Sequence, residues 1–477
     1  MRWVKCVTVV IFKLAHITKV EDLNESKGIK VESKTTMETV RVVSTITVKA
    51  SSETNSVEKI DLTPWDLQFL QIGTIQRGLL FLNQDKNRAS QIRHLQHSLS
   101  SALAFFPLLS GRLVIFRHPD NTVSSHIVCD HKGVPFVHAV APNTAVAHIV
   151  QPNYVPSVVR AMFPLNGVKN HQGQPLLAVQ VTELLDGVFI ALTINHVVAD
   201  GKSLWRFVNS WAQISHSGDG SLKPSAVPER FFLETVHRPI RFLFTKQQHQ
   251  IQSPSPSPSP TLVVPIMRVF HFTKQKITEL KAKARTEAGY DKISSLQALV
   301  SHVWRCVIGC CRHIEEHEEV VCMLPVGVRA RMVPALPEDY FGNAAVIGGV
   351  GMKAGELVGK GGLGKGALEM NKMIGLHTCE KLKREYEGWV RSPRLVALPC
   401  GGGGDGRLLA VGSSPRFDVY GNDFGWGKPV AVRSGGEVNG MVSLFAGVEE
   451  GSVDVEVTLA YEILEALGNE LHFVHAC

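Results

Sequence analysis

The sequence predicts an α/β protein built of two domains. Strand-like apolar runs alternate with segments of helical spacing in both halves of the chain. At 477 residues the chain is long enough to bury more than one core. A proline-rich stretch separates the halves, and its alternating Ser-Pro run at 253–260 favours extended polyproline II structure over helix or inner sheet. We therefore expect an N-terminal domain at 37–215, a crossover linker at 216–262 and a C-terminal domain at 263–477. A phosphorylated or partner-docking loop is the alternative interpretation of the linker.

The first half of the chain alternates strands with helices. Its predicted strands are short apolar runs rich in β-branched residues, and they span 40–48, 76–81, 176–182 and 188–194. Asp186-Gly187, between the last two runs, is a strong hairpin-turn signal. Two longer helices have apolar residues three or four positions apart. These residues are Ile92, Leu95, Leu99 and Leu103 in the first helix and Leu204, Phe207, Val208 and Trp211 in the second. Thr63 and Pro64 are suited to cap and begin a further ordered segment.

The second half repeats this alternation. Strands are expected at 263–272, 441–445 and 453–459, and the last of these alternates strictly between apolar and polar residues. One helix is expected around 277–284. Ser294 and Ser295 are potential N-caps of another helix, which carries Leu296, Leu299, Val300, Val303, Trp304 and Val307.

Composition limits the function classes. The net charge of +7 is modest and spread along the chain, and no basic run with interleaved aromatic residues occurs, so we expect no nucleic-acid partner. Nine cysteines are scattered and odd in number, which indicates a reducing, cytoplasmic location and no disulfide framework. Cys306, Cys310 and Cys311 lie in an apolar helical pattern without a paired C-x-x-C, so we interpret them as core thiols and expect no metal.

The N-terminal segment 1–36 differs from the rest of the chain. Its apolar run at 6–12 is short, lysines flank it, and no small-residue cleavage site follows, so a secretory signal is not expected. We interpret 1–36 as a non-core extension. The whole chain contains no uncharged apolar stretch of 18 residues, so we also expect no membrane span.

The most informative stretch is His196-Val-Val-Ala-Asp200, where a predicted buried strand gives way to a helix. An imidazole fixed at a strand end has a pKa suited to a general base. A carboxylate four residues later is able to fix the turn, cap the helix or pair with a cation. The alternative for such a short pattern, taken alone, is a polar turn with no chemical role.

Two glycine-containing stretches in the second half invite nucleotide-binding interpretations. Gly359 to Gly366 matches G-x-G-x-x-G, but no clean buried strand leads into it, so a loop or loose helix start is favoured. Asp423-Phe-Gly-Trp-Gly427 begins like a kinase metal motif, yet no kinase glycine-rich or catalytic loop accompanies it.

Together, His196-Val-Val-Ala-Asp200 and Asp423-Phe-Gly-Trp-Gly427 resemble the paired signature of the plant BAHD acyltransferases. The resemblance covers roughly residue 37 to the C-terminus and extends to three further segments. These are Leu62-Thr-Pro-Trp-Asp-Leu67, Phe106-Pro-Leu-Leu-Ser-Gly-Arg112 and Tyr340-Phe-Gly-Asn343.

This resemblance implies a fold and a reaction. The fold is two similar-sized mixed-sheet domains of the chloramphenicol-acetyltransferase-like type, joined by a long crossover, with an active-site channel between them. The reaction transfers an acyl group from an acyl-CoA co-substrate to a hydroxyl or amine of a small specialised metabolite. No permanently bound cofactor is expected. The sequence contains no sign of a coiled coil or an obligate partner, so we expect a monomer, although no motif specifies the oligomeric state.

The resemblance also assigns roles to individual residues. His196 deprotonates the acceptor without an acyl-enzyme, and Asp200 gives structural support. Asp423, Phe424, Gly425 and Gly427 form a structural motif acting through an arginine such as Arg329. Trp426 lines the channel and helps to steady the oxyanion. Ser294, Ser295 and Lys292 meet the phosphates of coenzyme A.

Several points stay open at the level of sequence. A lyase of the same fold and a catalytically silent small-molecule binding protein are the two alternative functions. The acyl donor, the acceptor and the choice between O- and N-acylation are not specified by any motif.

Overall fold

The computed structural model describes most of the chain from residue 39 onward. The described ranges are 39–51, 57–82, 87–166, 173–218, 229–243, 266–396, 406–436 and 438–470. The extension predicted at 1–36 and most of the linker predicted at 216–262 lie outside these ranges. The domain boundaries that depend on them therefore stay predictions.

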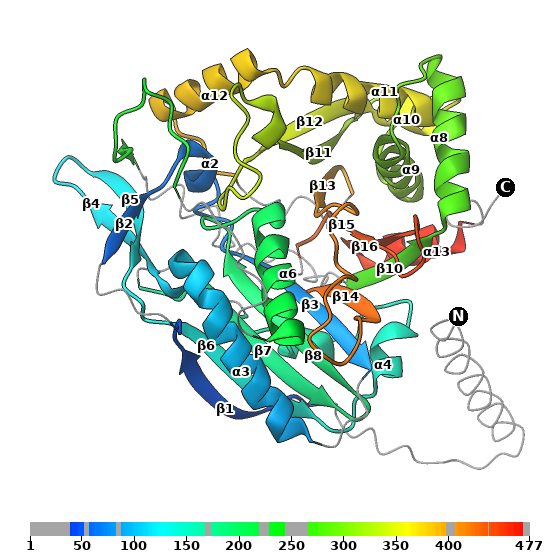
Figure 1. Cartoon of the computed structure of the whole chain (residues 1–477). Coiled ribbons are helices and arrows are strands. Elements are labelled where there is room, and N and C mark those ends of the chain that lie inside the picture. The colour runs from blue at the N-terminus through cyan, green and yellow to red at the C-terminus, as the bar shows by residue number, and fades with distance from the viewer. Residues whose placement is uncertain are drawn as a thin grey trace, which may run out of the picture. The chain divides into compact units, whose positions relative to one another are not determined.

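A six-stranded mixed sheet organises the first half of the chain (Figure 1). Its strands run in the order β1 (Arg41–Val48), β6 (Val134–Ala141), β7 (Leu177–Leu184), β8 (Gly187–Asn195), β3 (Thr74–Leu82) and β14 (Ala431–Ser434). Only the β6–β7 pair is parallel. The hairpin predicted around Asp186-Gly187 is confirmed as β7–β8, whose residues are largely buried as their apolar sequences require.

The second half forms another six-stranded sheet. Its order is β10 (Ile266–Phe272), β16 (Val453–Leu459), β15 (Met441–Ala446), β13 (Leu408–Gly412), β11 (Glu319–Gly327) and β12 (Ala345–Lys353). A smaller sheet contains β2 (Glu58–Asp61), β5 (Thr122–Cys129) and β4 (Arg112–Arg117), and β9 (Phe242–Leu243) pairs with β5. The mixed α/β fold expected from the sequence is thus present. Strand β14 belongs to the second half of the chain but completes the first sheet, where it pairs with β3.

Helices cover the sheets on their apolar sides. Over the first sheet, α3 (Arg88–Phe105) and α6 (Gly201–Ser217) lie side by side and share one core with β3 and β8 (Figure 1). The short α4 (Val146–Val150) and α5 (Val158–Ala161) pack on the opposite face. The helices packed against the second sheet are α8 (Lys274–Ala288), α9 (Ser295–Cys310), α10 (Ala354–Val358), α11 (Gly362–Gly375) and α13 (Tyr461–Asn469).

The remaining helices are short or lie between the halves. They are α2 (Pro64–Leu67), α12 (Cys379–Arg391) and the 3₁₀ turns η1 (Pro107–Ser110) and η2 (Arg329–Arg331). Helix α12 packs on α2, so a helix of the second half contacts the first. Among the described residues, no helix combines the length and the apolar character needed to cross a membrane.

Candidate active site

His196 is held at the point where β8 ends. Its backbone N–H donates to the carbonyl oxygen of Gly73 at 2.9 Å and so extends the β3–β8 ladder by one residue. The imidazole stacks on the ring of Phe69, with ring centroids 3.9 Å apart and planes inclined by 12°. The side chain is half-buried, and within the described part of the chain its Nδ1 atom has no hydrogen-bond partner. The result is an imidazole held in one orientation, with a buried Nδ1 that no described residue engages.

Asp200 lies at the start of α6 and performs three structural tasks. As the N-cap, its Oδ1 accepts from the N–H of Ser203 at 2.9 Å. It forms a two-point ion pair with Arg329, with Nη1 to Oδ2 at 2.6 Å and Nη2 to Oδ1 at 3.1 Å. It also accepts from the N–H of Ala344 at 3.0 Å. The carboxylate is therefore fully engaged and is not placed to act as a base.

Asn343 joins this frame to His196. Its Nδ2 donates to the carbonyl oxygen of His196 at 2.7 Å and to Oδ1 of Asp66 at 3.1 Å. Asp66 is itself fully buried and fixed by a reciprocal capping box with Thr63 at the start of α2. Sequence analysis assigned no role to Asn343 or Asp66. Two features of the sequence pointed to these residues: the Thr63-x-x-Asp66 spacing of a capping box and the Tyr340-Phe-Gly-Asn343 segment.

Burial and neighbouring charges set the protonation states of the pair. Burial lowers the pKa of His196 below 6.5, and the opposing influence of its own backbone and of the Asp200 charge does not restore it. Burial alone would raise the pKa of Asp200, but the Arg329 guanidinium and two backbone N–H groups hold it below 3.8. At neutral pH the imidazole is neutral, hence basic, and the carboxylate is charged.

The Asp423–Gly427 segment is a turn anchored on the far end of α6. Oδ1 of Asp423 accepts from the N–H groups of Gly425 at 2.8 Å and Gly427 at 2.9 Å. Both glycines have positive φ, 110° and 107°, which side chains rarely adopt. Ser215 of α6 donates to the carbonyl oxygen of Phe424 at 2.9 Å. The expected partnership of this segment with Arg329 is corrected here, since Arg329 pairs with Asp200 and Asp423 lies 3.5 Å from Nδ1 of His216.

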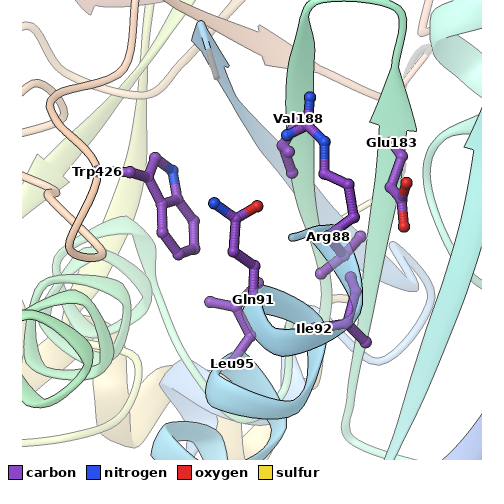
Figure 2. A pocket seen from close by; sticks show the side chains of 8 residues that line it. Arg88, Gln91, Ile92, Leu95, Glu183, Val188 and Trp426 are labelled. Atoms are coloured by element: carbon purple, nitrogen blue, oxygen red, sulfur yellow. The ribbon is translucent and has the colours of Figure 1, made fainter. Parts of the chain in front are cut away.

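Trp426 does not lie beside His196. Its ring is 6.2 Å from that of Phe81, which pairs with Val188 at the opposite end of β8. At about 3.3 Å per residue, the eight residues from Val188 to His196 span roughly 26 Å. Figure 2 shows Trp426 across a small, tight pocket from Gln91 and Arg88 of α3. The expectation that Trp426 steadies an oxyanion at His196 is therefore corrected.

Comparison with known proteins identifies the family. The model of the "Transferase family" matches residues 38–473. An uncharacterized acetyltransferase of Arabidopsis thaliana is 40% identical over 88% of this chain and 95% of its own length. The BAHD acyltransferase DCR of the same plant is 30% identical over 91% of this chain and 92% of its own length. The chain belongs to the BAHD acyltransferase family.

Solved structures agree with this assignment at the level of fold. Vinorine synthase superposes with a TM-score of 0.66 at 23% identity, covering 90% of this chain and 96% of its own. TRI101 of F. sporotrichioides, solved in complex with coenzyme A and T-2, superposes with a TM-score of 0.67 at 14% identity, covering 87% and 98%. The fold predicted from the BAHD resemblance is confirmed.

The residues expected to meet coenzyme A lie together at the start of α9. Ser294 is the N-cap, and its Oγ accepts from the N–H of Gln297 at 3.2 Å within a capping box. Lys292 and Ser295 are exposed beside it. The predicted cap is confirmed as a structural feature of this BAHD protein, and its contact with coenzyme A stays a prediction.

Proposed function

We propose that this BAHD acyltransferase moves an acyl group from a coenzyme A thioester to a hydroxyl or amine of a small specialised metabolite, with His196 as the general base. The observation that carries the proposal is the state of His196: half-buried, stacked on Phe69, with an unengaged Nδ1 and a pKa below 6.5. A base of this kind is neutral at pH 7 and able to take a proton from an attacking acceptor.

In the proposed reaction the acyl group passes directly from donor to acceptor, by addition and then elimination. The acceptor gives its proton to the imidazole of His196 as its oxygen or nitrogen attacks the thioester carbonyl. The tetrahedral species then expels the thiolate of coenzyme A, which recovers the proton. Asp200, held by Arg329, keeps the loop that carries His196 in place and exchanges no proton in this scheme.

Four of the described cysteines are poorly suited to carry an acyl-enzyme. Burial raises the pKa of the Cys129, Cys306 and Cys322 thiols to about 12 and that of Cys310 to about 11. A thiol with so high a pKa is rarely the reactive thiolate at neutral pH. These four thiols are therefore assigned no role as nucleophiles, and the proposed mechanism uses no covalent intermediate.

The donor assignment rests on family likeness. TRI101, which shares the fold, was solved with coenzyme A bound, and Ser294, Ser295 and Lys292 present polar groups at a helix start where a phosphate is favourably held. We propose this segment as the site for the coenzyme A phosphates. A monomeric state and a cytoplasmic location remain part of the same proposal.

The deciding experiment measures free-thiol release from a panel of acyl-CoA donors with pooled phenolic, alcohol and amine acceptors. Wild type should release thiol only when an acceptor is present. His196→Ala should lower the rate by about 10²–10⁴ while still binding coenzyme A. Full activity in a folded His196→Ala protein would refute the mechanism. Absence of both release and coenzyme A binding would favour the lyase or the silent binding protein.

A further inference from the structure

Arg77 is a largely desolvated cation on the central strand β3. Arg77 lies where the two large sheets approach each other. Its strand β3 pairs with β14, and its Cζ atom is 5.4 Å from the centroid of the Phe445 ring of β15. Burial lowers the pKa of Arg77 to about 10, so the side chain stays charged at neutral pH. Removing a charged side chain from water is unfavourable, so a buried cation normally has a counter-ion.

No such counter-ion is present among the described residues. The guanidinium donates one hydrogen bond, to the neighbouring carbonyl oxygen of Gln76 at 2.7 Å, and forms no ion pair with the described carboxylates. The exposure of the residue is intermediate, so its side chain is not completely covered by the surrounding protein. Most of its donors are thus available to a ligand.

The carboxylate that interacts electrostatically with Arg77 is that of Glu456, which is hydrogen-bonded to another residue. Glu456 of β16 accepts from the N–H of Ser434 at 3.1 Å and also from its hydroxyl. Burial raises the pKa of Glu456, although the nearby Arg433 and Arg77 charges oppose the shift. Glu456 therefore attracts Arg77 without neutralising it.

Arg77 faces the same side of the sheet as His196. Arg77 pairs with Leu192, and because strand residues alternate between faces, Leu192, Ile194 and His196 point the same way. The four residues from Leu192 to His196 span roughly 13 Å. The positive charge of Arg77 also contributes to the low pKa of His196, so the two groups interact electrostatically. A small substrate at His196 is within reach of this cation.

We propose that Arg77 binds a carboxylate carried by one of the two co-substrates, so that the protein prefers a substrate with a free carboxylate to its neutral counterpart. The planar guanidinium matches a carboxylate in a two-point, charge-assisted pair. This inference rests on the proposed function, since the substrate is positioned relative to His196. A purely structural role, in which Arg77 only packs on Phe445, is the competing explanation.

The test compares matched acids and neutral compounds. Acceptor pairs are p-coumarate and 4-hydroxybenzoate with their methyl esters, and donor pairs are malonyl-CoA with acetyl-CoA and succinyl-CoA with butyryl-CoA. We expect wild type to prefer the acid in at least one pair by about tenfold or more in kcat/KM. Arg77→Met should abolish that preference by slowing the acid alone, and Arg77→Lys, which retains the charge, should keep part of it. The pair that responds identifies acceptor or donor as the source of the carboxylate.

A control and a binding measurement separate the alternatives. Phe445→Leu removes the ring under Arg77 without changing charge, and it should preserve the acid preference. Calorimetry of the same compounds with His196→Ala protein reports the preference in binding even if acyl transfer itself is not the reaction. Equal treatment of acid and neutral compounds by wild type, or an undiminished preference in Arg77→Met, would overturn the assignment. Loss of the preference in Phe445→Leu as fully as in Arg77→Met would also overturn it.

Discussion

Asp200 and Arg329 form a buried two-point ion pair between residues 129 positions apart in the chain. The arginine also donates to the hydroxyl of Ser203 at 3.0 Å and to the carbonyl oxygen of Gly342 at 3.1 Å. Helix α6 of the first half and the 340–343 segment of the second are thereby joined four residues from the proposed base. The His196–Asp200 motif thus has two roles. His196 is the proposed base, and Asp200 connects the two halves of the chain.

Removing one charge of this pair should be costly. Asp200→Asn leaves the Arg329 cation buried and uncompensated, and the free energy of unfolding should fall by about 3–5 kcal/mol. Chemical denaturation measures this, and kcat/KM should fall with it because the His196 loop loses its support. Lys202 on the same helix forms the matched exposed pair with Glu338, at 2.6 Å. Glu338→Gln should change stability by less than about 1 kcal/mol. Equal effects of the two substitutions would contradict the connecting role of Asp200.

The pH dependence of activity should report the imidazole. Because burial lowers the pKa of His196 below 6.5, the neutral base persists above that pH and is lost as pH falls through the folded value. The unfolded chain takes up the same proton nearer 6.5, so this group also reduces stability over that window as pH falls. Profiles of kcat/KM between about pH 5 and 8 should show an acidic limb with its midpoint below 6.5. A midpoint above 6.5 would contradict the assignment of His196 as a desolvated base.

Asn343 should act as a positioning residue. Asn343→Ala removes the amide hydrogen bonds to the carbonyl oxygen of His196 and to Oδ1 of Asp66, although Oδ1 keeps the backbone N–H of residue 343. The free energy of unfolding should fall by about 1–3 kcal/mol. We also expect kcat to fall more than KM rises, since the imidazole loses its fixed orientation. Gln180→Ala is the matched control, because Gln180 is a buried amide that donates to the carbonyl oxygen of Ala161 at 3.0 Å. It should cost stability and leave kcat unchanged. A similar kcat loss in both proteins would indicate general destabilisation instead.

Trp426 should contribute to stability and little to catalysis. The indole packs beside Phe81 and α3, far from His196, and its N–H has no partner within the described part of the chain. Trp426→Phe keeps an aromatic ring and loses no hydrogen bond, so kcat/KM should stay close to wild type while thermal stability falls slightly. Steady-state kinetics and thermal melting measure the two effects. A large loss of kcat with an unchanged melting temperature would return Trp426 to the active site.

Sequence patterns predicted local elements well and long-range partnerships poorly. The β7–β8 hairpin follows from two apolar runs around Asp186-Gly187, and the α9 cap follows from Ser294, because both depend on neighbours in the chain. The Asp200–Arg329 pair could not be read from spacing, since nothing local links residues so far apart. Arg329 was therefore expected beside the wrong aspartate.

The same limit explains the other corrections. Trp426 belongs to the Asp423–Gly427 motif of the family, but its distance from His196 depends on where the following strand, β14, enters the first sheet. The sequence does not indicate that β14 pairs with a strand of the first half. Its four residues are too few to show a pattern that identifies a partner strand. Arg77 was likewise hidden inside an ordinary strand, where only burial and the lack of an ion pair distinguish it.

The N-terminal extension offers a final test of domain organisation. The family match begins at residue 38 and the described structure at residue 39, where β1 soon pairs with β6. A chain beginning at Met37 should therefore fold, bind coenzyme A and retain the kcat/KM of the full-length protein. Its control is a chain beginning after β1, at residue 49, which removes an edge strand of the first sheet and should unfold at a lower denaturant concentration. Aggregation of the Met37 protein under conditions that keep the full chain monodisperse would show that residues 1–36 contribute to the core, because an incomplete fold exposes apolar surface.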